Sequence, residues 1–550
     1  MNPSSPGPSA RTSPSRGPAH GQGYPSARGS TPGPDRVRVT ILGRKPANGS
    51  TAPLLTRDFA AAEQTESIRR GATGWRIREL PAVDDGARRS PLDARAWAVD
   101  ARRSMPPPAD APLVLAVDLG TSGVRVAAVD PEGRSHGAAT RSLPIHFGPD
   151  GAAEEDPEEI WRAFAAAVGE ALGQEPGAAG RVQAILCDSQ YSSLVPVDAA
   201  GLPVGPLVLY LDRRGAAPSD ALVKAHPELW SLWIERHGMP SPGGGSDSLA
   251  HWLWFQTERP DVHAKARAYV EPADYLTARL TGRVTANVCT LFPLLLTDNR
   301  RGSEGGWCEE LIEASGVDRS RLPELVPPES VVGELRPEHA TAWGLPPGVR
   351  VYSGVNDTQA LTFGTASHLG GRLGVSIGTT LVPTTVVESM RADLAHFLLT
   401  QPASIPDRHL VMAEGGLAGK ALEFVLEQLV YTDDPLGDHR RADPFAHLDE
   451  VVAATPPGAD GVVFLPWLAG LWAPAGDGRA RGAFLNLSLG TGRPHLVRAV
   501  LEGVACQLAW LLPPIEALTG RTADELVFAG GGAESEAWAQ IRAARLTAAP

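Results

Sequence analysis

The first clear run of apolar positions begins at residue 113. Residues 113–117 read Leu-Val-Leu-Ala-Val and end in Asp118, and the turn at residues 119–123 separates them from a second apolar run at residues 124–129. Short apolar runs bounded by glycine-rich turns are typical of β-strands. The pattern therefore predicts a β-hairpin that opens the first folded domain and continues into another strand.

A helix is predicted shortly after this hairpin. Asp156 is a favourable helix cap, Pro157 suits the first helical position, and the two glutamates that follow favour the positive end of the helix. Apolar residues then recur at helical spacing, at Ile160, Trp161, Phe164, Val168 and Leu172. Further strands are predicted at residues 181–186, 194–197 and 208–210. The order of strands and helix indicates an α/β domain.

A related pattern recurs in the second half of the chain. Residues 374–377 lead into Gly378-Thr379-Thr380 and then into the apolar residues 381–387, which again predicts strand, turn and strand. A long helix with an apolar face is predicted at residues 496–512, a strand at 526–529, and a helix at 536–546 that Ser535 caps. Two domains with similar openings suggest an internal duplication with a cleft between the halves.

Residues 1–110 have a different composition, rich in Pro, Gly, Ser and Arg. Such a segment buries too little apolar area to offset its chain entropy, so a disordered extension is predicted, in which residues 37–42 form at most one short strand. Its 17 basic and 10 acidic residues contrast with 33 basic and 53 acidic residues in the remainder. Two interpretations stay open: an extension without function, for which Met105 is a candidate native start, or a basic tail that binds nucleic acid or an anionic surface.

Length and composition limit the classes of protein to which this chain can belong. A chain of 550 residues is too long for one core and fits two domains plus extra segments. The chain has a net charge of −13, and its acidic excess lies after residue 110. This charge argues against nucleic-acid binding by the folded part. The four cysteines form no C-x-x-C pair, so neither a zinc knuckle nor a disulfide framework is indicated. No apolar run approaches the roughly 18 residues of a membrane span, and the start lacks an apolar signal stretch, so a cytoplasmic protein without membrane contact is expected.

The turn after the first strand is the first candidate for chemistry. Asp118 ends the strand, and the following turn exposes the backbone N–H groups and the hydroxyls of Thr121 and Ser122. Such a turn can hold phosphate oxygens while the carboxylate reaches their magnesium ion, and Arg125 can add a charge-assisted contact. An Asp-Gly hairpin turn is also common without any ligand. The chain has no Gly-x-x-x-x-Gly-Lys-Ser/Thr motif, which argues against a P-loop NTPase.

Two more glycine turns and one carboxylate complete the set of candidates. Gly378-Thr379 is the matching turn of the second domain, and residues 530–535 read Gly-Gly-Gly-Ala-Glu-Ser before a predicted helix. Glycines permit close backbone approach, and the helix start offers free N–H groups. Asp357 follows a predicted strand at residues 349–352, just before the second domain, where it can face the cleft and accept a proton from a substrate hydroxyl. The alternative is that Asp357 only caps a helix.

From about residue 113 to about residue 542 these motifs resemble the FGGY carbohydrate kinases, the family that includes xylulokinase, gluconokinase and glycerol kinase. The resemblance also covers residues 154–157, 212–214, 272–276, 280–282 and 498–503. Within the family, the sequence as a whole resembles the xylulokinase-like branch most. It implies two ribonuclease-H-like (actin-like ATPase) α/β domains around a cleft. The sugar-binding domain is expected at 111–360 and the ATP-binding domain at 361–550. Family members continue beyond the helix at residues 536–546, so the second domain is expected to be C-terminally truncated.

The resemblance also implies a role for each matching residue. Asp357 matches the catalytic base, which also touches the substrate, and Asp118 matches the magnesium-associated carboxylate. The residues matching the phosphate turns are Thr121, Ser122, Arg125, Gly378 and Thr379. Those matching the adenosine loop are Gly531, Gly532 and Ser535, and Gly416 is expected to line the nucleotide site as well. The segment that contacts the sugar matches Gln190, Tyr191 and Ser192.

The resemblance predicts ATP-dependent phosphorylation of a sugar or polyol, with Mg²⁺, a small-molecule acceptor and no nucleic-acid partner. Homodimers are common in the family, although no interface signal is visible in this sequence. Xylulokinases usually have Gln-Met-His where this chain has Gln190-Tyr191-Ser192, so the acceptor stays open. Two alternatives remain: an inactive or truncated pseudokinase that binds nucleotide on the same fold, and an interaction protein that acts through its basic N-terminal tail.

Overall fold

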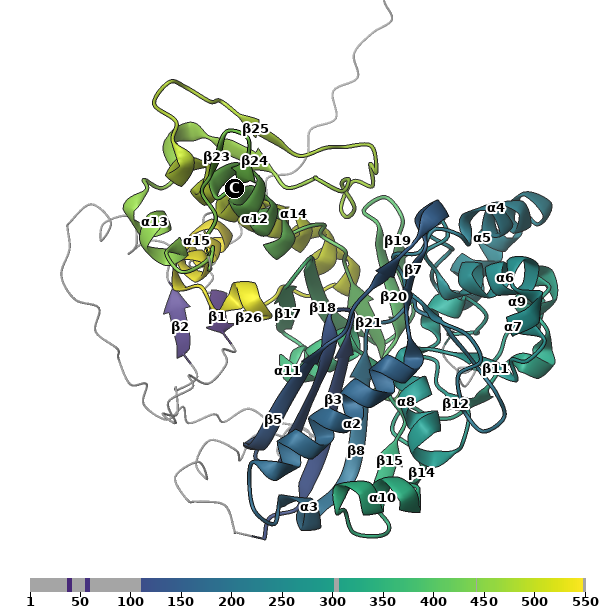
Figure 1. Cartoon of the computed structure of the whole chain (residues 1–550). Helices are drawn as coiled ribbons and strands as arrows, with labels where there is room; N and C mark the ends of the chain where they lie inside the picture. Colours follow the sequence, from purple (N-terminus) through teal and green to yellow (C-terminus); the bar gives the residue numbers. More distant parts are fainter. Residues whose placement is uncertain (1–36, 42–54, 60–109, 301–305, 442, 548–550) are drawn as a thin grey trace, which may run out of the picture. The chain divides into compact units, whose positions relative to one another are not determined.

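Two mixed β-sheets organise the chain (Figure 1). The structure is a computed structural model that describes residues 37–41, 55–59, 110–300, 306–441 and 443–547. The rest of the predicted N-terminal extension, including Met105, lies outside the described residues.

The first sheet has the strand order β14-β15-β8-β3-β4-β5, with β16 also paired to β8. Its strands are β3 (Leu113–Gly120), β4 (Gly123–Val129), β5 (Ser135–Ser142), β8 (Val182–Ser189), β14 (Val331–Glu334), β15 (Arg350–Tyr352) and β16 (Val355–Asn356). Strands β3 and β4 are antiparallel around a turn at Thr121 and Ser122, which confirms the predicted hairpin. Strand β8 then pairs with β3 in parallel.

Helix α2 (Pro157–Gly173) covers β4 and β5 of this sheet. The predicted cap is confirmed, because Asp156 accepts a hydrogen bond from the backbone N–H of Glu158 over 2.8 Å. The helix buries Ile160, Phe164 and Val168 completely, at helical spacing. Burying each such side chain stabilises the fold by about 1.5–3 kcal/mol.

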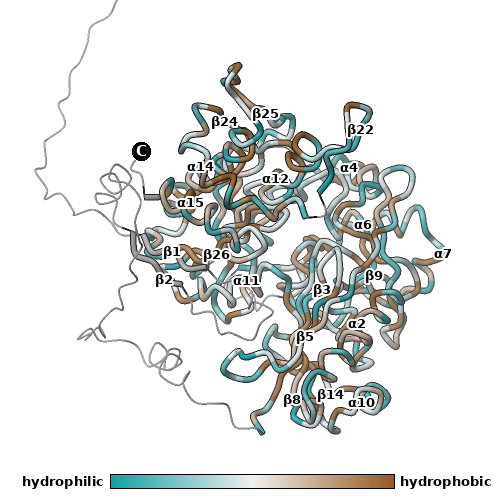
Figure 2. The backbone as a smooth tube through the Cα atoms, turned by 60° about the vertical axis from the view of Figure 1, so that its left-hand side comes forward, coloured by the Kyte–Doolittle hydropathy of each residue, from teal (hydrophilic) through white to brown (hydrophobic). Residues whose placement is uncertain are grey.

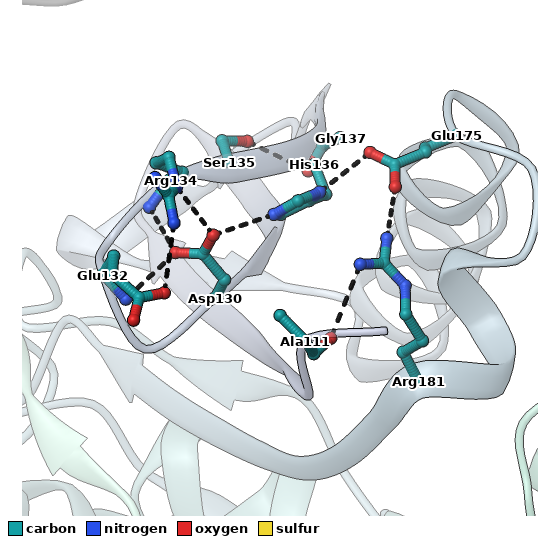
Figure 3. A network of polar contacts seen from close by, with 9 residues as sticks. All are labelled: Ala111, Asp130, Glu132, Arg134, Ser135, His136, Gly137, Glu175 and Arg181. Atoms are coloured by element: carbon teal, nitrogen blue, oxygen red, sulfur yellow. Dashed lines mark hydrogen bonds and ion pairs between the residues drawn. The ribbon is translucent and has the colours of Figure 1, made fainter. Parts of the chain in front are cut away.

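A polar network ties the far end of α2 to the turn between β4 and β5 (Figure 3). Both ring nitrogens of His136 are engaged, Nε2 with Asp130 at 3.0 Å and Nδ1 with Glu175 at 2.8 Å. Arg134 adds an ion pair to Asp130 at 2.9 Å. Burial would raise the pKa of Asp130, but the hydrogen bonds from His136 and Arg134 outweigh it and hold that pKa at about 2. The network fixes the edge of the sheet at neutral pH.

Between β8 and β14 the chain builds a second core around aromatic side chains. Trp233, Trp252, Phe255 and Tyr269 are buried together there. The helices between β8 and β14 are α4 (Ala216–Ala225), α5 (Leu229–Leu232), α6 (Ser248–Glu258), α7 (Pro260–His263), α8 (Pro272–Thr281) and α9 (Glu309–Ser315). The short helix α3 (Ala178–Arg181) precedes β8, and α10 (Pro337–Trp343) follows β14. The short strands of this region include β9 (Val195–Val197), β10 (Leu207–Val208) and β11 (Ala268–Val270). Strand β10 pairs with β7 (Ala153–Glu155), which lies earlier in the chain, before α2.

The second sheet has the order β19-β20-β21-β18-β17-β26-β1-β2. Its strands are β17 (Arg372–Ile377), β18 (Leu381–Val387), β19 (Ala392–Asp393), β20 (Leu398–Pro402), β21 (His409–Met412), β26 (Glu525–Ala529), β1 (Val37–Ile41) and β2 (Leu55–Phe59). Strands β17 and β18 are antiparallel around the predicted turn at Gly378–Thr380, and β26 pairs with β17 in parallel. The second hairpin is therefore confirmed.

The two sheets have the same order of pairing around their hairpins, which fits the predicted duplication. In the first sheet the hairpin β3–β4 lies beside β8, and β8 pairs in parallel with both β3 and β15. In the second sheet the hairpin β17–β18 lies beside β26, and β26 pairs in parallel with both β17 and β1, although β1 comes before the hairpin in the chain. Strand β1 confirms the short strand expected at residues 37–42, but it is not isolated. Strand β1 lies beside β26 in the second sheet, as β15 lies beside β8 in the first. A local sequence pattern cannot show that β1 pairs with a strand so far away in the chain.

Helix α14 (Arg493–Thr519) is the central helix of the second half. Among the described residues it is the one helix long and apolar enough for a membrane span, and more than half of its apolar stretch is buried in the protein. Its apolar residues appear brown in Figure 2, and Val500, Leu501 and Leu508 are fully buried. It packs with α12 (Gly419–Val425), α13 (Leu448–Ala454) and α15 (Glu536–Thr547), as a core helix does. All four cysteines are free, in agreement with the absence of a disulfide framework.

Candidate active site

Three neighbouring strand segments bring the acidic residues of the first sheet together. In the parallel ladder of β3 and β8, Asp118 lies opposite Asp188, and Asp188 also lies opposite Val355 of β16. Asp357 follows Val355 by two residues and begins α11 (Asp357–Gly364). The side chain of Asn356, not of Asp357, caps this helix, by accepting a hydrogen bond from the N–H of Gln359 over 3.0 Å. The alternative that Asp357 is only a helix cap is therefore wrong.

The carboxyl group of Asp357 is open to solvent and yet surrounded by protein. Asp357 is exposed, but burial of its carboxyl group by the surrounding atoms raises its pKa to about 6. A hydrogen bond from the Thr358 hydroxyl at 3.2 Å opposes that rise, and the charge of Asp118 adds to it. Asp357 thus lies near Asp118 and has access to solvent, which are the two conditions that a catalytic base at this position must meet.

Asp118 is held by the arginine predicted to contact phosphate. The Arg125 guanidinium donates a hydrogen bond to Asp118 Oδ2 over 2.7 Å, and both side chains are partly exposed. Beside them, burial and the charges of Asp118 and Asp357 raise the pKa of Asp188 well above its usual value. The sequence analysis did not single out Asp188. Asp188 lies two residues beyond the strand predicted at 181–186, and its pairing with Asp118 is visible only in the folded sheet.

The predicted sugar segment begins with a glutamine that the protein holds on both sides. The Thr121 hydroxyl donates to Gln190 Oε1 over 2.5 Å, and Gln190 Nε2 donates to Glu155 Oε2 over 3.5 Å. Burial raises the pKa of Glu155 to about 8, so this carboxyl is mostly neutral at pH 7. Gln190 therefore connects the turn after β3 to β7, and Glu155 is a second residue of the site that the sequence analysis missed.

The next residues of the sugar segment meet the end of β21. The Tyr191 hydroxyl donates a hydrogen bond to the sulfur of Met412 over 3.1 Å, while Ser192 has a left-handed backbone with φ of 58°. Two residues after Met412, burial and the charge of Asp357 raise the pKa of Glu414 to about 7. Met412 and Glu414 complete the surroundings of Asp357. Only the folded chain identifies them, because no motif in the sequence marks them.

The turn between β17 and β18 packs against the segment that contains Gly416. The backbone N–H of Gly419 donates to Gly378 O over 2.8 Å, and that of Ala418 donates to Thr379 O over 3.0 Å. The N–H of Leu381 donates to Gly416 O over 2.9 Å. A Cβ atom at Gly419 would lie 2.4 Å from Gly378 O, so only glycine fits there.

The third glycine turn lies against the same place, because β26 runs beside β17. Gly530 has a φ of 89°, and a Cβ atom there would lie 2.8 Å from Ile377 O. Ser535 caps α15 as predicted, accepting a hydrogen bond from Trp538 N over 3.1 Å. Gly532 O accepts a hydrogen bond from the buried Arg542 over 3.0 Å. The structure thus brings the predicted nucleotide residues of the second half together: Gly378, Thr379, Gly416, Gly531, Gly532 and Ser535.

The described residues offer few side chains that could bind a metal ion together. Within the ranges that the structure describes, no three or more His, Cys, Asp or Glu side chains are grouped so that they could hold an ion. The carboxylates of Asp118 and Asp188 face each other on neighbouring strands. Magnesium is commonly bound by one or two carboxylates together with water and substrate phosphates. The residues present fit that mode and do not form an all-protein metal cage.

Known proteins match the chain over both halves. The N-terminal domain model of the FGGY family of carbohydrate kinases matches residues 113–364, and the C-terminal domain model matches residues 373–548. A gluconokinase of Bacillus subtilis is 24% identical over 78% of this chain and 82% of its own length. A xylulose kinase of Escherichia coli is 27% identical, with 78% and 84% covered. The crystal structure of a xyloylose kinase from Brucella ovis superposes with a TM-score of 0.69 and 26% identity, covering 79% of this chain and 85% of that one.

Proposed function

Since this chain belongs to the FGGY family of carbohydrate kinases, we propose that it transfers the γ-phosphoryl group of ATP to a hydroxyl group of a sugar or polyol, with Asp357 as the base. One observation carries this assignment: Asp357 is open to solvent beside Asp118, and its pKa is about 6. A carboxylate with that pKa is mostly ionised at pH 7 and is a stronger base than an ordinary aspartate.

The proton step uses groups of the first half. As the acceptor hydroxyl attacks, its proton moves to the Asp357 carboxylate, a new bond forms between its oxygen and the γ-phosphorus, and the bond between that phosphorus and the ADP oxygen breaks. The Thr358 hydroxyl, 3.2 Å from Asp357 Oδ1, orients the carboxylate.

The glycine turns supply the nucleotide site in this proposal. Backbone N–H groups at Thr121, Ser122 and Thr379 and the hydroxyls of Ser122 and Thr379 hold phosphate oxygens, and Arg125 adds a positive charge. The convergence of Gly378, Gly416 and the Gly531–Gly532 turn supports an adenosine site in the second half. Sugar binding is accordingly assigned to residues 111–360 and nucleotide binding to residues 361–550.

Asp118, with Asp188 opposite it, would hold the magnesium ion of the nucleotide. When bound, that ion supplies positive charge that stabilises the phosphoryl oxygens. Arg125 pairs with Asp118 at 2.7 Å, so its guanidinium lies beside the carboxylate proposed to hold this ion.

The acceptor is proposed as a small sugar, aldonate or polyol. The relatives are named for gluconate and xylulose, and the segment Gln190–Ser192 differs from the xylulokinase pattern. Gln190 is held by Thr121 and Glu155, and the Tyr191 hydroxyl is held by Met412, so Ser192 is the member of the segment whose side chain has most freedom to meet the acceptor. A cytoplasmic location and a homodimer fit this function and belong to the proposal.

A coupled assay for ADP release tests the proposal. Pentuloses, hexuloses, polyols and aldonates are screened at fixed ATP and Mg²⁺, and at least one acceptor is expected to stimulate ADP release well above the rate without acceptor. Nucleotide binding without stimulation by any of them would favour the pseudokinase alternative. Full turnover of a chain that lacks residues 1–104 would dismiss the N-terminal tail as the active part.

A further inference from the structure

A polar hollow lies beside the segment that links the two halves. Helix α11 ends at Gly364, a 3₁₀ turn spans Ser367–Leu369, and Gly370 and Gly371 both have positive φ, of 79° and 67°. Strand β17 begins immediately afterwards. The hollow has a volume of about 140 Å³ and lies at the end of β17 and β18 opposite to their Gly378–Thr380 turn.

Three arginines surround this hollow, together with one carboxylate. Arg391 donates to Leu518 O over 2.7 Å, and Arg408 donates to Asp407 O over 3.4 Å. Arg521 lies 3.8 Å from Glu388, and both of these side chains are well exposed, so the pair is weak. Each guanidinium carries five N–H donors. The contacts formed within the described residues leave most of these donors available.

The charge here is opposite to that of the protein body. The chain from residue 111 onward carries 33 basic and 53 acidic residues, whereas this hollow has three guanidiniums and one carboxylate. A concave site of one sign concentrates the field and attracts counter-ions. The planar guanidinium fork matches phosphate oxygens in pairs, which makes arginine the preferred side chain for this anion.

We propose that the hollow lined by Arg391, Arg408 and Arg521 is a second binding site, separate from the nucleotide turns, for a small anion that carries a phosphate group. Its volume accommodates a phosphate with a small organic part. The three arginines come from the segment after β18, the loop before β21 and the segment after α14, so one anion joins three separate parts of the chain.

The position of the site implies that the bound anion affects catalysis. His368 lines the hollow, and it lies four residues after the end of α11, the helix whose first residue is Asp357. An anion that fixes Arg391, Arg408 and Arg521 around this linker restrains the movement of α11. This coupling rests on the proposed kinase function, whereas the binding itself does not.

Isothermal titration of the full chain with inorganic phosphate tests the binding. Saturable binding is expected for the wild type, and Arg408→Gln should weaken it by about tenfold, as loss of a charge-assisted hydrogen bond predicts. The matched control is Arg440→Gln, because Arg440 is also exposed and pairs with Asp438 on a distant loop. Arg521→Gln is the second variant, should Arg408→Gln not fold. Phenyl phosphate, titrated in parallel, distinguishes a phosphorylated metabolite from free phosphate by which of the two binds more tightly.

Absence of saturable binding of either probe at 20 mM would refute the site. Equal affinity in the wild type, Arg408→Gln and Arg521→Gln would refute it as well, since phosphate would then bind elsewhere. The coupling is measured separately, as turnover with and without saturating phosphate. Without phosphate, the wild type and Arg408→Gln are expected to turn over at equal rates. Saturating phosphate is expected to change the turnover of the wild type at least twofold and to leave that of Arg408→Gln unchanged. An unchanged wild-type turnover would refute the coupling. Failure of every sugar to support turnover would refute the proposed function and leave the titration valid.

Discussion

The hydroxyl of Tyr191 donates a hydrogen bond to the sulfur of Met412 over 3.1 Å, although 221 positions separate the two residues along the chain. The bond joins the loop after β8 to the end of β21, and Met412 also lies 3.9 Å from the Thr358 hydroxyl. Residues from both halves thus meet beside Asp357. This contact makes the sugar segment sensitive to the second half of the protein.

Replacing Tyr191 by Phe keeps the ring and removes this bond. Sulfur is a weak acceptor, so we expect only a small effect, a rise of about two- to fivefold in the KM for the acceptor with little change in kcat. Steady-state kinetics with the best acceptor measures both constants. A loss of more than a hundredfold in kcat would mean that the Tyr191 hydroxyl takes part in the chemistry.

Replacing Asp357 by Asn keeps the shape of the side chain and removes the base. General base catalysis contributes typically about 10²–10⁴-fold, so kcat should fall by that factor while ADP and acceptor still bind. Asp261→Asn is the matched control, because Asp261 is exposed and pairs with Arg259 far from this site. Calorimetry of ADP binding, together with turnover, separates loss of chemistry from loss of folding. Near-native turnover of the Asn variant would remove Asp357 from the mechanism.

The activity should depend on pH through the same carboxyl group. Burial raises the pKa of Asp357 from 3.8 to about 6, and a base acts only when it is deprotonated. We therefore expect kcat/KM to rise with pH up to about 6 and to level off above it. The profile is measured between pH 4.5 and 8, with the folded fraction followed by circular dichroism. A plateau that already extends down to pH 4.5 would contradict this assignment of the base.

We expect that no side chain larger than that of glycine fits at position 419, where Gly419 contacts the Gly378–Thr379 turn. In Gly419→Ala the new Cβ atom would lie 2.4 Å from Gly378 O, a backbone atom that has to move. Overpacking of this kind costs about 1–3 kcal/mol, so the affinity for ADP should fall by roughly five- to a hundredfold.

The matched control is Gly169→Ala in α2, where no atom lies within 4 Å of the new Cβ. Alanine is the better helix former, so this variant should be more stable by about 0.5–1 kcal/mol and bind ADP normally. Equal ADP affinity in Gly419→Ala and the wild type would show that the turn does not touch the nucleotide.

Strand β1 should contribute to the stability of the second sheet. Val39 pairs with Leu526 of β26 on one side and with Arg57 of β2 on the other. A proline at a position paired on both sides cannot donate to the ladder. Val39→Pro should therefore lower the free energy of unfolding by about 1–3 kcal/mol in urea titrations. A chain that lacks only residues 1–35 is the control, and identical unfolding of all three proteins would show that β1 adds nothing.

Local patterns predicted the elements that depend on neighbouring residues. The hairpin turns at Thr121–Ser122 and Gly378–Thr380, the Asp156 cap of α2 and the Ser535 cap of α15 are all confirmed. Each is decided by a few adjacent residues, because turns and caps depend on backbone conformation and on short hydrogen bonds. Asp357 also lies near Asp118, because Asp118 in β3 and Val355 in β16 are both paired with Asp188 of β8.

Residues whose role depends on distant pairing could not be predicted in this way. Burial raises the pKa values of Asp188, Glu155 and Glu414, and neighbouring charges add to the rise at Asp188 and Glu414. The hydrogen bond that connects Gln190 to Thr121 spans 69 positions. Strand register and tertiary burial are properties of the folded chain, and no short window of sequence contains them.

The pairing of β1 with β26 also affects how the protein is made. Val39 and Leu526 are about 490 residues apart, so β1 leaves the ribosome long before its neighbour β26. Until residues 525–529 emerge, the backbone of β17 is unpaired on that side, and an unpaired strand edge can join another nascent chain. Ribosome stalling late in the message should therefore be more harmful to this protein than stalling within the first half, whose own sheet is complete by residue 356.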